Sequence, residues 1–381
     1  MKLRLITLIS ALLAMALPLA GEARPSSAAP PTPADVGQNF KLYLPLVEKN
    51  FFLFSGPQIP FGYGWGVYNF RAYWPDLTQY PPTSFNWIKI TDNPPKEDLC
   101  GSHRLPYNVL IRLNKTDANA TVQEVADDTW TWAHNMNMES APGVSRCVDA
   151  FEIGNEPNLS MQGAYSGPVN PERYADQLCE AYTAVKNTDP GFIVVSAGLA
   201  PTGGVSDTTI AMESETFMRR MLDRIRDTHA GDAGACFDVL GYHNYGFRTG
   251  YATDPNSADC PAGMCFRGAE RIFDILSLEY GVTKRLWATE TGWMRDFVAG
   301  GCGSAPWASS FAGFQLSDTA QANQLVGAFQ YSRANWSWIG AMFVFNLDFN
   351  TRPQGSCVDE QHWFAVKDYP AEAALENMSK P

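Results

Sequence analysis

Eight short apolar runs, separated by stretches with helical periodicity, restrict the fold of this chain more than any other feature. Most of the runs lack apolar and polar alternation, as expected for strands that are buried on both faces. Apolar strands that alternate with helices are typical of a parallel α/β fold. The runs occupy residues 61–67, 85–90, 107–113, 148–153, 192–197, 237–242, 285–289 and 339–346. The pattern predicts a single-domain (β/α)8 barrel, the TIM barrel.

Start and stop signals support the helices between these strands. Thr121 and Glu124 form a capping box, in which each side chain bonds the backbone N–H of the other. Asn170 followed by Pro171 predicts an N-cap and a first helical turn, and the Pro-Gly pair at 190–191 ends the same helix. An open doubly wound sheet is the competing architecture, but no Gly-x-Gly-x-x-Gly follows a strand.

Two connections depart from the regular pattern. The link between the second and third runs is short and contains the Pro-Pro pair at 94–95, so we expect a loop in place of the second barrel helix. Residues 39–60 precede the first run, and we interpret them as an extra strand or as a plug at one end of the barrel.

The N-terminal segment has the composition of an export signal. Two basic residues precede an apolar run over residues 5–19, and small residues follow it. The run is shorter than the roughly 20 apolar residues that a membrane span needs. We therefore expect a signal peptide at residues 1–23, a Pro/Ala/Ser-rich linker at 24–38 and the barrel domain at 39–381. The mature protein is then secreted, with no membrane attachment.

Eight cysteines in an exported chain predict up to four disulfides, for which sequence alone allows about 105 complete pairings. Cys260 and Cys265 can close a short loop. Cys302 and Cys357 follow the last two strands, which are neighbours in a barrel, so we expect them to pair as well. A metal site is the alternative, but the cysteines are scattered singly and lack paired ligand spacing.

Two glutamates follow strands on opposite sides of the predicted barrel. The fourth strand leads into Phe-Glu-Ile-Gly-Asn-Glu-Pro-Asn at 151–158, and the seventh into Leu-Trp-Ala-Thr-Glu-Thr-Gly-Trp at 286–293. The carboxyl ends of all barrel strands meet at one rim, where active sites lie. Glu156 and Glu290 can therefore approach each other. Hydrolysis of a glycosidic bond with retention needs two carboxyl groups about 5 to 5.5 Å apart.

The two motifs resemble those of the clan A glycoside hydrolases, over residues 61–365. The resemblance implies that Glu156 is the acid/base, that Glu290 is the nucleophile and that Asn155 bonds the 2-hydroxyl of the sugar being cleaved. Asn-Glu-Pro-Asn is similar to family 39 and related endoglycosidases. Glu-Thr-Gly-Trp is also similar to the family 17 β-1,3-glucanases, so the family within the clan and a β-1,3-glucanase-like activity stay open.

The segment Gly-Tyr-His-Asn-Tyr-Gly at 241–246 resembles the His-x-Tyr element of many clan members. Tyr245 would then hydrogen-bond the nucleophile and hold it ionised. His243 would line the sugar site, although a packed histidine at the barrel rim explains it equally well.

Clan members often carry a Trp at the end of the eighth strand as a platform for a sugar ring. Here the segment 343–349 reads Phe-Val-Phe-Asn-Leu-Asp-Phe, without a Trp. Trp293 and Trp65 are candidates to replace it, and ordinary packing at the rim is the alternative for both.

Net charge and composition restrict the classes of partner and cofactor that the chain can bind. A net charge of −12 disfavours nucleic acid, because no basic cluster is present to neutralise phosphates. A metal-dependent hydrolase on this fold would need histidine clusters at the strand ends, and the chain has only five His. We expect a monomer without metal or cofactor.

The sequence thus predicts a secreted retaining glycoside hydrolase that cleaves β-glycosidic bonds of a polysaccharide or oligosaccharide by double displacement. The main alternative is a non-catalytic carbohydrate-binding barrel, which usually arises by loss of a carboxylate, and both glutamates are present here. The long loops at 246–266 and 294–315 can wall a pocket for exo action or a groove for endo action.

Overall fold

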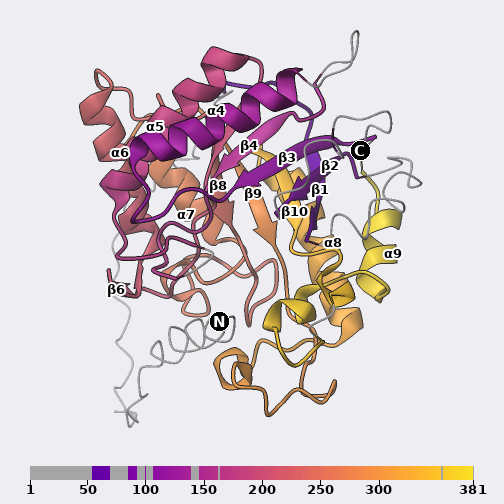
Figure 1. The fold of residues 1–381 in the computed structure, drawn as a ribbon. Helices are drawn as coiled ribbons and strands as arrows, with labels where there is room; N and C mark the ends of the chain where they lie inside the picture. Colours follow the sequence, from indigo (N-terminus) through magenta and orange to yellow (C-terminus); the bar gives the residue numbers. More distant parts are fainter. Residues whose placement is uncertain are drawn as a thin grey trace, which may run out of the picture.

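The computed structural model describes residues 54–68, 85–91, 99, 106–138, 146–161, 164–352 and 355–380. Within these residues eight parallel strands close into a barrel in the order β1-β10-β9-β8-β5-β4-β3-β2 (Figure 1). The strands are β1 (Gly62–Val67), β2 (Trp87–Ile90), β3 (Asn108–Leu113), β4 (Ala150–Ile153), β5 (Ile193–Ser196), β8 (Val239–His243), β9 (Arg285–Thr291) and β10 (Ile339–Val344). Each falls on one of the eight predicted runs, so the predicted barrel is confirmed.

Helices cover the outside of the barrel (Figure 1). Those in the described residues are α4 (Val122–Met138), α5 (Pro171–Thr188), α6 (Ser214–Thr228), α7 (Gly268–Asp274), α8 (Asp318–Asn335) and α9 (Pro370–Asn377). Both predicted caps are confirmed. Thr121 Oγ1 accepts from the backbone N–H of Glu124 at 3.1 Å, while Glu124 Oε2 accepts from the N–H of Thr121 at 2.7 Å. Asn170 Oδ1 accepts from the N–H of Arg173 at 2.9 Å.

Several predictions fall outside the described residues. These are the signal peptide, the linker and most of the connection between β2 and β3, of which only Thr91 and Leu99 are described before residue 106. Of the interpreted plug or strand at 39–60, the structure describes residues 54–60, and they form no strand. Ile59 packs against the core inside the barrel. In the described part of the chain no helix combines the length and apolarity that crossing a membrane requires.

The barrel interior is filled by large side chains from strands that are not neighbours. Trp87 of β2 contacts Trp287 of β9 edge to face, with ring centroids 5.0 Å apart, so the two rings meet across the interior. Phe343 of β10 lies against both. Gly64 of β1 leaves room for that ring, because a Cβ there would lie 2.2 Å from it. The interior is therefore a packed core below the rim.

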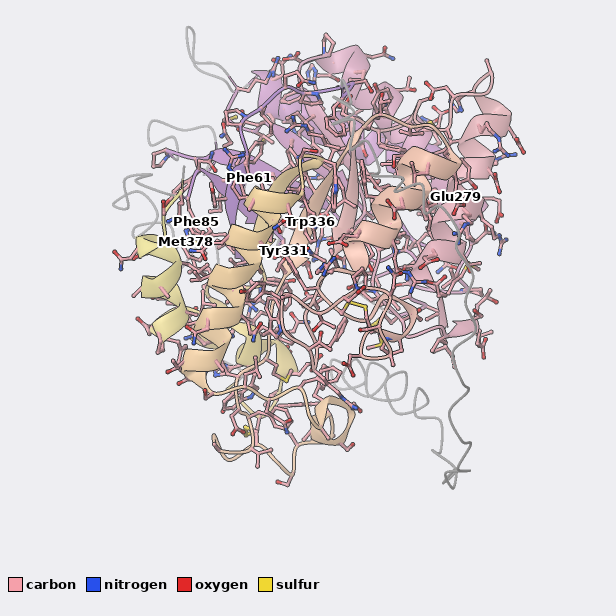
Figure 2. All side chains as sticks on the ribbon, turned by 180° about the vertical axis from the view of Figure 1, so that it is seen from behind. Phe61, Phe85, Glu279, Tyr331, Trp336 and Met378 are labelled. Carbon is pink, nitrogen blue, oxygen red and sulfur yellow. A yellow bond between two sulfur atoms is a disulfide. The ribbon has the colours of Figure 1, made fainter. Side chains whose placement is uncertain are left out.

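Aromatic side chains also join the barrel wall to α8. Tyr63 of β1 stacks on Phe329 of α8 with ring centroids 5.8 Å apart. At the end of α8, Tyr331 meets the C-cap residue Trp336 edge to face (Figure 2). Phe85, just before β2, meets Phe329 of α8 at 5.6 Å. Much of the aromatic content of the chain thus serves packing.

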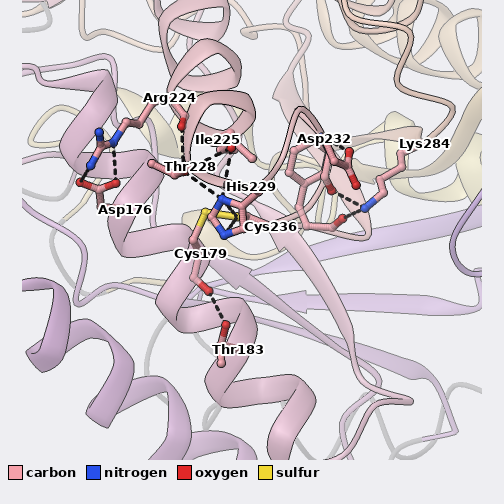
Figure 3. The surroundings of a disulfide bond; sticks show 12 residues. Asp176, Cys179, Thr183, Arg224, Ile225, Thr228, His229, Asp232, Cys236 and Lys284 are labelled. Carbon is pink, nitrogen blue, oxygen red and sulfur yellow. Dashed lines mark hydrogen bonds and ion pairs between the residues drawn. A yellow bond between two sulfur atoms is a disulfide. The ribbon is translucent and has the colours of Figure 1, made fainter.

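Three disulfides join described residues. The predicted pairs Cys260–Cys265 and Cys302–Cys357 are both confirmed. The third, Cys179–Cys236, was not predicted. It ties α5 to the segment that enters β8, with the His229 imidazole beside it and Nε2 at 3.6 Å from Cys236 Sγ (Figure 3). Cysteines that are paired in this way are not metal ligands, since a metal binds the thiolate.

Candidate active site

The structure brings Glu156 and Glu290 together at the C-terminal rim of the barrel. Glu156 lies just past the end of β4, and Glu290 is the penultimate residue of β9. One carboxylate oxygen of each glutamate and one ring nitrogen of His243 all lie within 4.8 Å of one another. Residues far apart in the sequence thus form one cluster.

The loop that carries Glu156 is held in an unusual backbone conformation. Glu156 has a φ of 41°, in the left-handed region that non-glycine residues rarely adopt and that is enriched at functional sites. Its N–H donates to the carbonyl of Gly198 at 3.1 Å. The last residue of the Asn-Glu-Pro-Asn motif fixes the same loop. The buried Asn158 side chain accepts from the N–H of Ala200 at 3.0 Å and donates to the carbonyl of Met212 at 3.0 Å.

Glu290 is surrounded by donors and positive charges. Tyr245 donates its hydroxyl proton to Glu290 Oε2 at 2.5 Å. Lys89 Nζ and Arg112 Nη1 contact Oε1 at 3.3 and 3.5 Å. Burial by itself would raise the pKa of Glu290, but attraction to His243, Lys89 and Arg112, together with the Tyr245 hydrogen bond, lowers that pKa to about 2. Glu290 is therefore a carboxylate at mildly acidic and neutral pH.

Tyr245 lies where the sequence placed it, beside the candidate nucleophile. Burial raises its pKa well above the usual value for tyrosine, and the charges of Glu290 and Glu156 raise it further. The phenol thus keeps its proton and remains a donor to Glu290.

His243 lies behind the two carboxyl groups. Its side chain is fully buried, and Nδ1 is 2.9 Å from Glu156 Oε1 and 3.5 Å from Glu290 Oε2. It is not among the residues that line the cavity described below. Its position suits a group that orients the carboxyl groups rather than one that touches the sugar.

Lys89 and Arg112 are functional residues that the sequence analysis missed. Lys89 is fully buried and also contacts the fully buried Glu152, with Nζ 2.7 Å from Oε2. Arg112 Nη1 donates to Asn155 Oδ1 at 3.0 Å and so orients that side chain. The signal that would have found them is a single basic residue inside each of two apolar strands, since a buried charge needs a partner.

A cavity opens at this rim and encloses about 1140 Å³, open solvent at its mouth included. Asn155 and the carboxyl groups of Glu156 and Glu290 lie in its wall, as does Glu360, which the sequence analysis did not single out. The rest of the lining is mostly apolar. The aromatic lining residues are Tyr68, Tyr245, Phe247, Phe311, Phe314, Phe345 and Phe364. Both long loops, 246–266 and 294–315, contribute to this wall.

The structure places neither candidate platform residue in the cavity wall. Trp65 is buried and stacks on Phe85 with ring centroids 3.8 Å apart. Trp293 is buried and donates from Nε1 to the carbonyl of Thr249 at 2.8 Å. Both are core residues. Phe345, directly after β10, lines the cavity instead.

The cluster of Glu156, His243 and Glu290 also has the spacing of a metal-ligand set. Two cationic side chains, Lys89 and Arg112, already lie against Glu290. Their charge would repel a divalent ion at short range. The arrangement therefore fits an ionised carboxylate with protein-supplied counter-charges better than it fits a metal centre.

Comparison with known proteins finds no matching family model and no relative among the curated proteins. Among solved structures, the GH53 catalytic domain of Ignisphaera aggregans superposes with a TM-score of 0.53 and 15% identity, over 85% of this chain and 98% of the other. A structure from a study of two fungal β-1,4-galactanases has a TM-score of 0.52 and 11% identity, over 84% of this chain and all of the other. At such identities the likeness is one of fold. The chain shares the (β/α)8 barrel of these glycoside hydrolases.

Proposed function

We propose that this protein is a retaining glycoside hydrolase of clan A that cleaves β-glycosidic bonds. The observation that carries the proposal is the approach of Glu156 and Glu290, whose carboxylate oxygens come within 4.8 Å at the barrel rim. Retaining enzymes hold the two carboxyl groups about 5 to 5.5 Å apart, whereas inverting enzymes leave about 6.5 to 9.5 Å for a water molecule. The short separation favours direct attack by one carboxylate.

Each residue of the site has a role in this reaction. Glu290 attacks the anomeric carbon while Glu156 protonates the departing oxygen, and Glu156 then removes a proton from the water that releases the product. Tyr245, Lys89 and Arg112 hold Glu290 ionised and fix its orientation. Asn155, which Arg112 orients, is placed to bond the sugar that is being cleaved.

The substrate that fits this cavity is an uncharged carbohydrate. Among the described residues that line it there are three glutamates and no Lys, Arg or His. An anionic sugar would meet negative charge without a counter-ion, whereas a neutral sugar can lay its apolar face on the aromatic walls. A polysaccharide or oligosaccharide is therefore proposed, with a β-1,3-glucanase-like activity and a family 39 type of specificity both left open.

Secretion is part of the proposal. Disulfides persist in oxidising compartments, and three of them join described residues. Together with the composition of residues 1–23, they support an exported protein that acts outside the cell. The proposal takes the protein to be a monomer.

The decisive experiment measures product release from β-linked glucans, xylans, mannans and galactans by wild type, Glu156→Ala and Glu290→Ala. We expect one polymer class to be cut by wild type and by neither variant, and the first product to keep the β configuration by proton NMR. Glu279→Ala is the matched control, since Glu279 is an exposed surface partner of Arg219. Undiminished hydrolysis by Glu290→Ala, or an α product, would contradict the proposal.

Two alternatives have their own signatures in the same experiment. A carbohydrate-binding barrel without catalysis would bind a glycan of the panel and release no product. A metal-dependent hydrolase would lose activity in a chelator, whereas the carboxylate mechanism does not.

A further inference from the structure

Glu360 is a buried carboxyl group in the wall of the active-site cavity that the proposed mechanism does not use. It begins the short 3-10 helix Glu360–Phe364, which follows β10. The residue is 5% exposed and lines the same cavity as Glu156 and Glu290. Its Oε2 atom is buried and has no hydrogen-bond partner among the described residues. A buried polar atom without a partner is costly, and native proteins keep very few of them.

The surroundings of Glu360 differ from those of Glu290 in the same cavity. No ion pair joins Glu360 to a basic side chain in the part of the chain that the structure describes, whereas Glu290 contacts two. Burial raises the pKa of Glu360 to about 7, with a further contribution from the charge of Asp359. At mildly acidic pH the group is a neutral carboxylic acid, which both donates and accepts a hydrogen bond.

The segment that presents Glu360 is fixed to the barrel. The N–H of Gln361 donates to Asp359 Oδ1 at 3.0 Å, and its carbonyl accepts from Asn346 Nδ2 at 3.1 Å. Asn346 lies just past β10. Gln361 and Phe364 of the same short helix also line the cavity. One short helix therefore supplies a carboxyl group and an aromatic ring to the same cavity wall, and small-molecule sites combine such polar and aromatic groups.

We propose that Glu360, with Phe364 beside it, forms a specificity subsite whose carboxyl group hydrogen-bonds a hydroxyl of an uncharged sugar unit. A sugar hydroxyl is itself a donor and an acceptor. It can therefore donate a hydrogen bond to the unpaired carboxyl oxygen and accept one from the carboxyl O–H at the same time. A uronic acid unit would place a second carboxyl group here, and none of the described residues that line the cavity is a Lys, Arg or His that could pair with it. The subsite selects neutral sugars over acidic ones. This inference rests on the proposed glycosidase function, and it names a residue that sets which substrate the enzyme accepts.

Binding measured without turnover tests the subsite separately from catalysis. In a Glu156→Gln background, calorimetry would follow neutral β-linked tetrasaccharides of glucose, xylose, mannose and galactose, with a β-1,4-linked tetraglucuronide as the acidic probe. We expect Glu360→Met, which keeps side-chain length but no polar atom, to weaken binding of the preferred neutral glycan by about 10- to 100-fold. Glu360→Gln keeps a donor and an acceptor, so it should stay within a few-fold of the parent.

Glu372→Gln is the matched control. The pKa of Glu372 is also raised by burial, but Glu372 accepts from the N–H of Asp368 and does not line the cavity. It should leave binding unchanged. Circular dichroism and the melting temperature of each variant check that it is folded.

The outcomes separate the subsite from the reaction. Hydrolysis by wild type, with equal binding by folded Glu360→Met, overturns the subsite and leaves the proposed function standing. Binding that depends on Glu360 in a protein that hydrolyses nothing supports the subsite and overturns the proposed function. Tighter binding of the tetraglucuronide than of every neutral glycan, or no binding of any probe, overturns the subsite.

Discussion

The hydrogen bond from Tyr245 to Glu290 offers the sharpest test of how the site keeps the proposed nucleophile ionised. Tyr245→Phe removes one oxygen atom and leaves the ring, which packs against Phe345 and Phe364 with centroids 5.5 Å away in each case. The substitution therefore deletes the donor to Glu290 Oε2 with little change in shape.

The size of the effect follows from that hydrogen bond. A hydrogen bond to a charged group contributes about 1.5 to 3 kcal/mol, and one pKa unit corresponds to about 1.4 kcal/mol. Loss of the donor should raise the pKa of Glu290 by about one to two units. Starting from a pKa of about 2, the group would then titrate near pH 3 to 4.

The assay is the pH dependence of kcat/KM on an aryl β-glycoside with a good leaving group, whose departure needs little acid assistance. The acid limb of this profile reports ionisation of the nucleophile in the free enzyme. Because protonation inactivates Glu290, a higher pKa moves the limb to higher pH. The kcat/KM of wild type should stay constant down to about pH 3. The kcat/KM of Tyr245→Phe should begin to fall at a pH about one to two units higher.

Tyr280→Phe is the control for loss of a phenol, since Tyr280 donates to the carbonyl of Arg219, outside the cavity. Its acid limb should coincide with that of wild type. An unshifted limb in Tyr245→Phe, with the fold intact by circular dichroism, would refute the argument that Tyr245 helps to hold Glu290 ionised.

Three further predictions concern stability, each measured by unfolding in denaturant. Lys89→Met should cost about 3 to 5 kcal/mol, because it leaves the fully buried Glu152 unpaired; an unchanged midpoint would show that the pair is not needed. The pKa of Glu360 is about 7 in the folded state and about 4.5 in an unfolded chain, so the folded state keeps the proton to higher pH. Wild type should therefore lose about 3 kcal/mol of stability as the pH rises from 4.5 to 7. Glu360→Gln should lack this loss, and an equal loss in both proteins would contradict the assignment. Replacing Cys179 and Cys236 by Ala opens a connection of 57 residues and should cost about 4 kcal/mol, whereas a cost below 1 kcal/mol would count against the loop-entropy argument.

The sequence was most informative where a residue pattern has one physical reading. Strands that are buried on both faces are apolar along most of their length, so all eight could be located from the sequence. The Thr121–Glu124 box and the Asn170 cap are local interactions within four residues, which is why they hold in the structure. Cys302 and Cys357 could be paired because they follow the last two strands in a fold that makes those strands neighbours.

Contacts between side chains of strands that are distant in the sequence could not be predicted from the sequence. Nothing in the spacing places Lys89 between Glu152 and Glu290, which come from two other strands. The candidate platforms Trp65 and Trp293 are surrounded by core residues, because a tryptophan near a strand end can turn inward as readily as outward. Glu360 follows no strand directly, so its place in the cavity depends on the course of the loop after β10.

Lys89 makes three positions of this site depend on one another. One ammonium group serves both Glu152 and Glu290, so a change at any of the three positions alters what the other two tolerate. Loss of Glu290 alone would remove a counter-charge from both Lys89 and Arg112, and loss of Lys89 alone would leave the buried Glu152 without its Lys89 ion pair and Glu290 with Arg112. A substitution at one of the three positions should therefore be tolerated better when the other two change with it. The charge balance around the proposed nucleophile is a property of the three residues together.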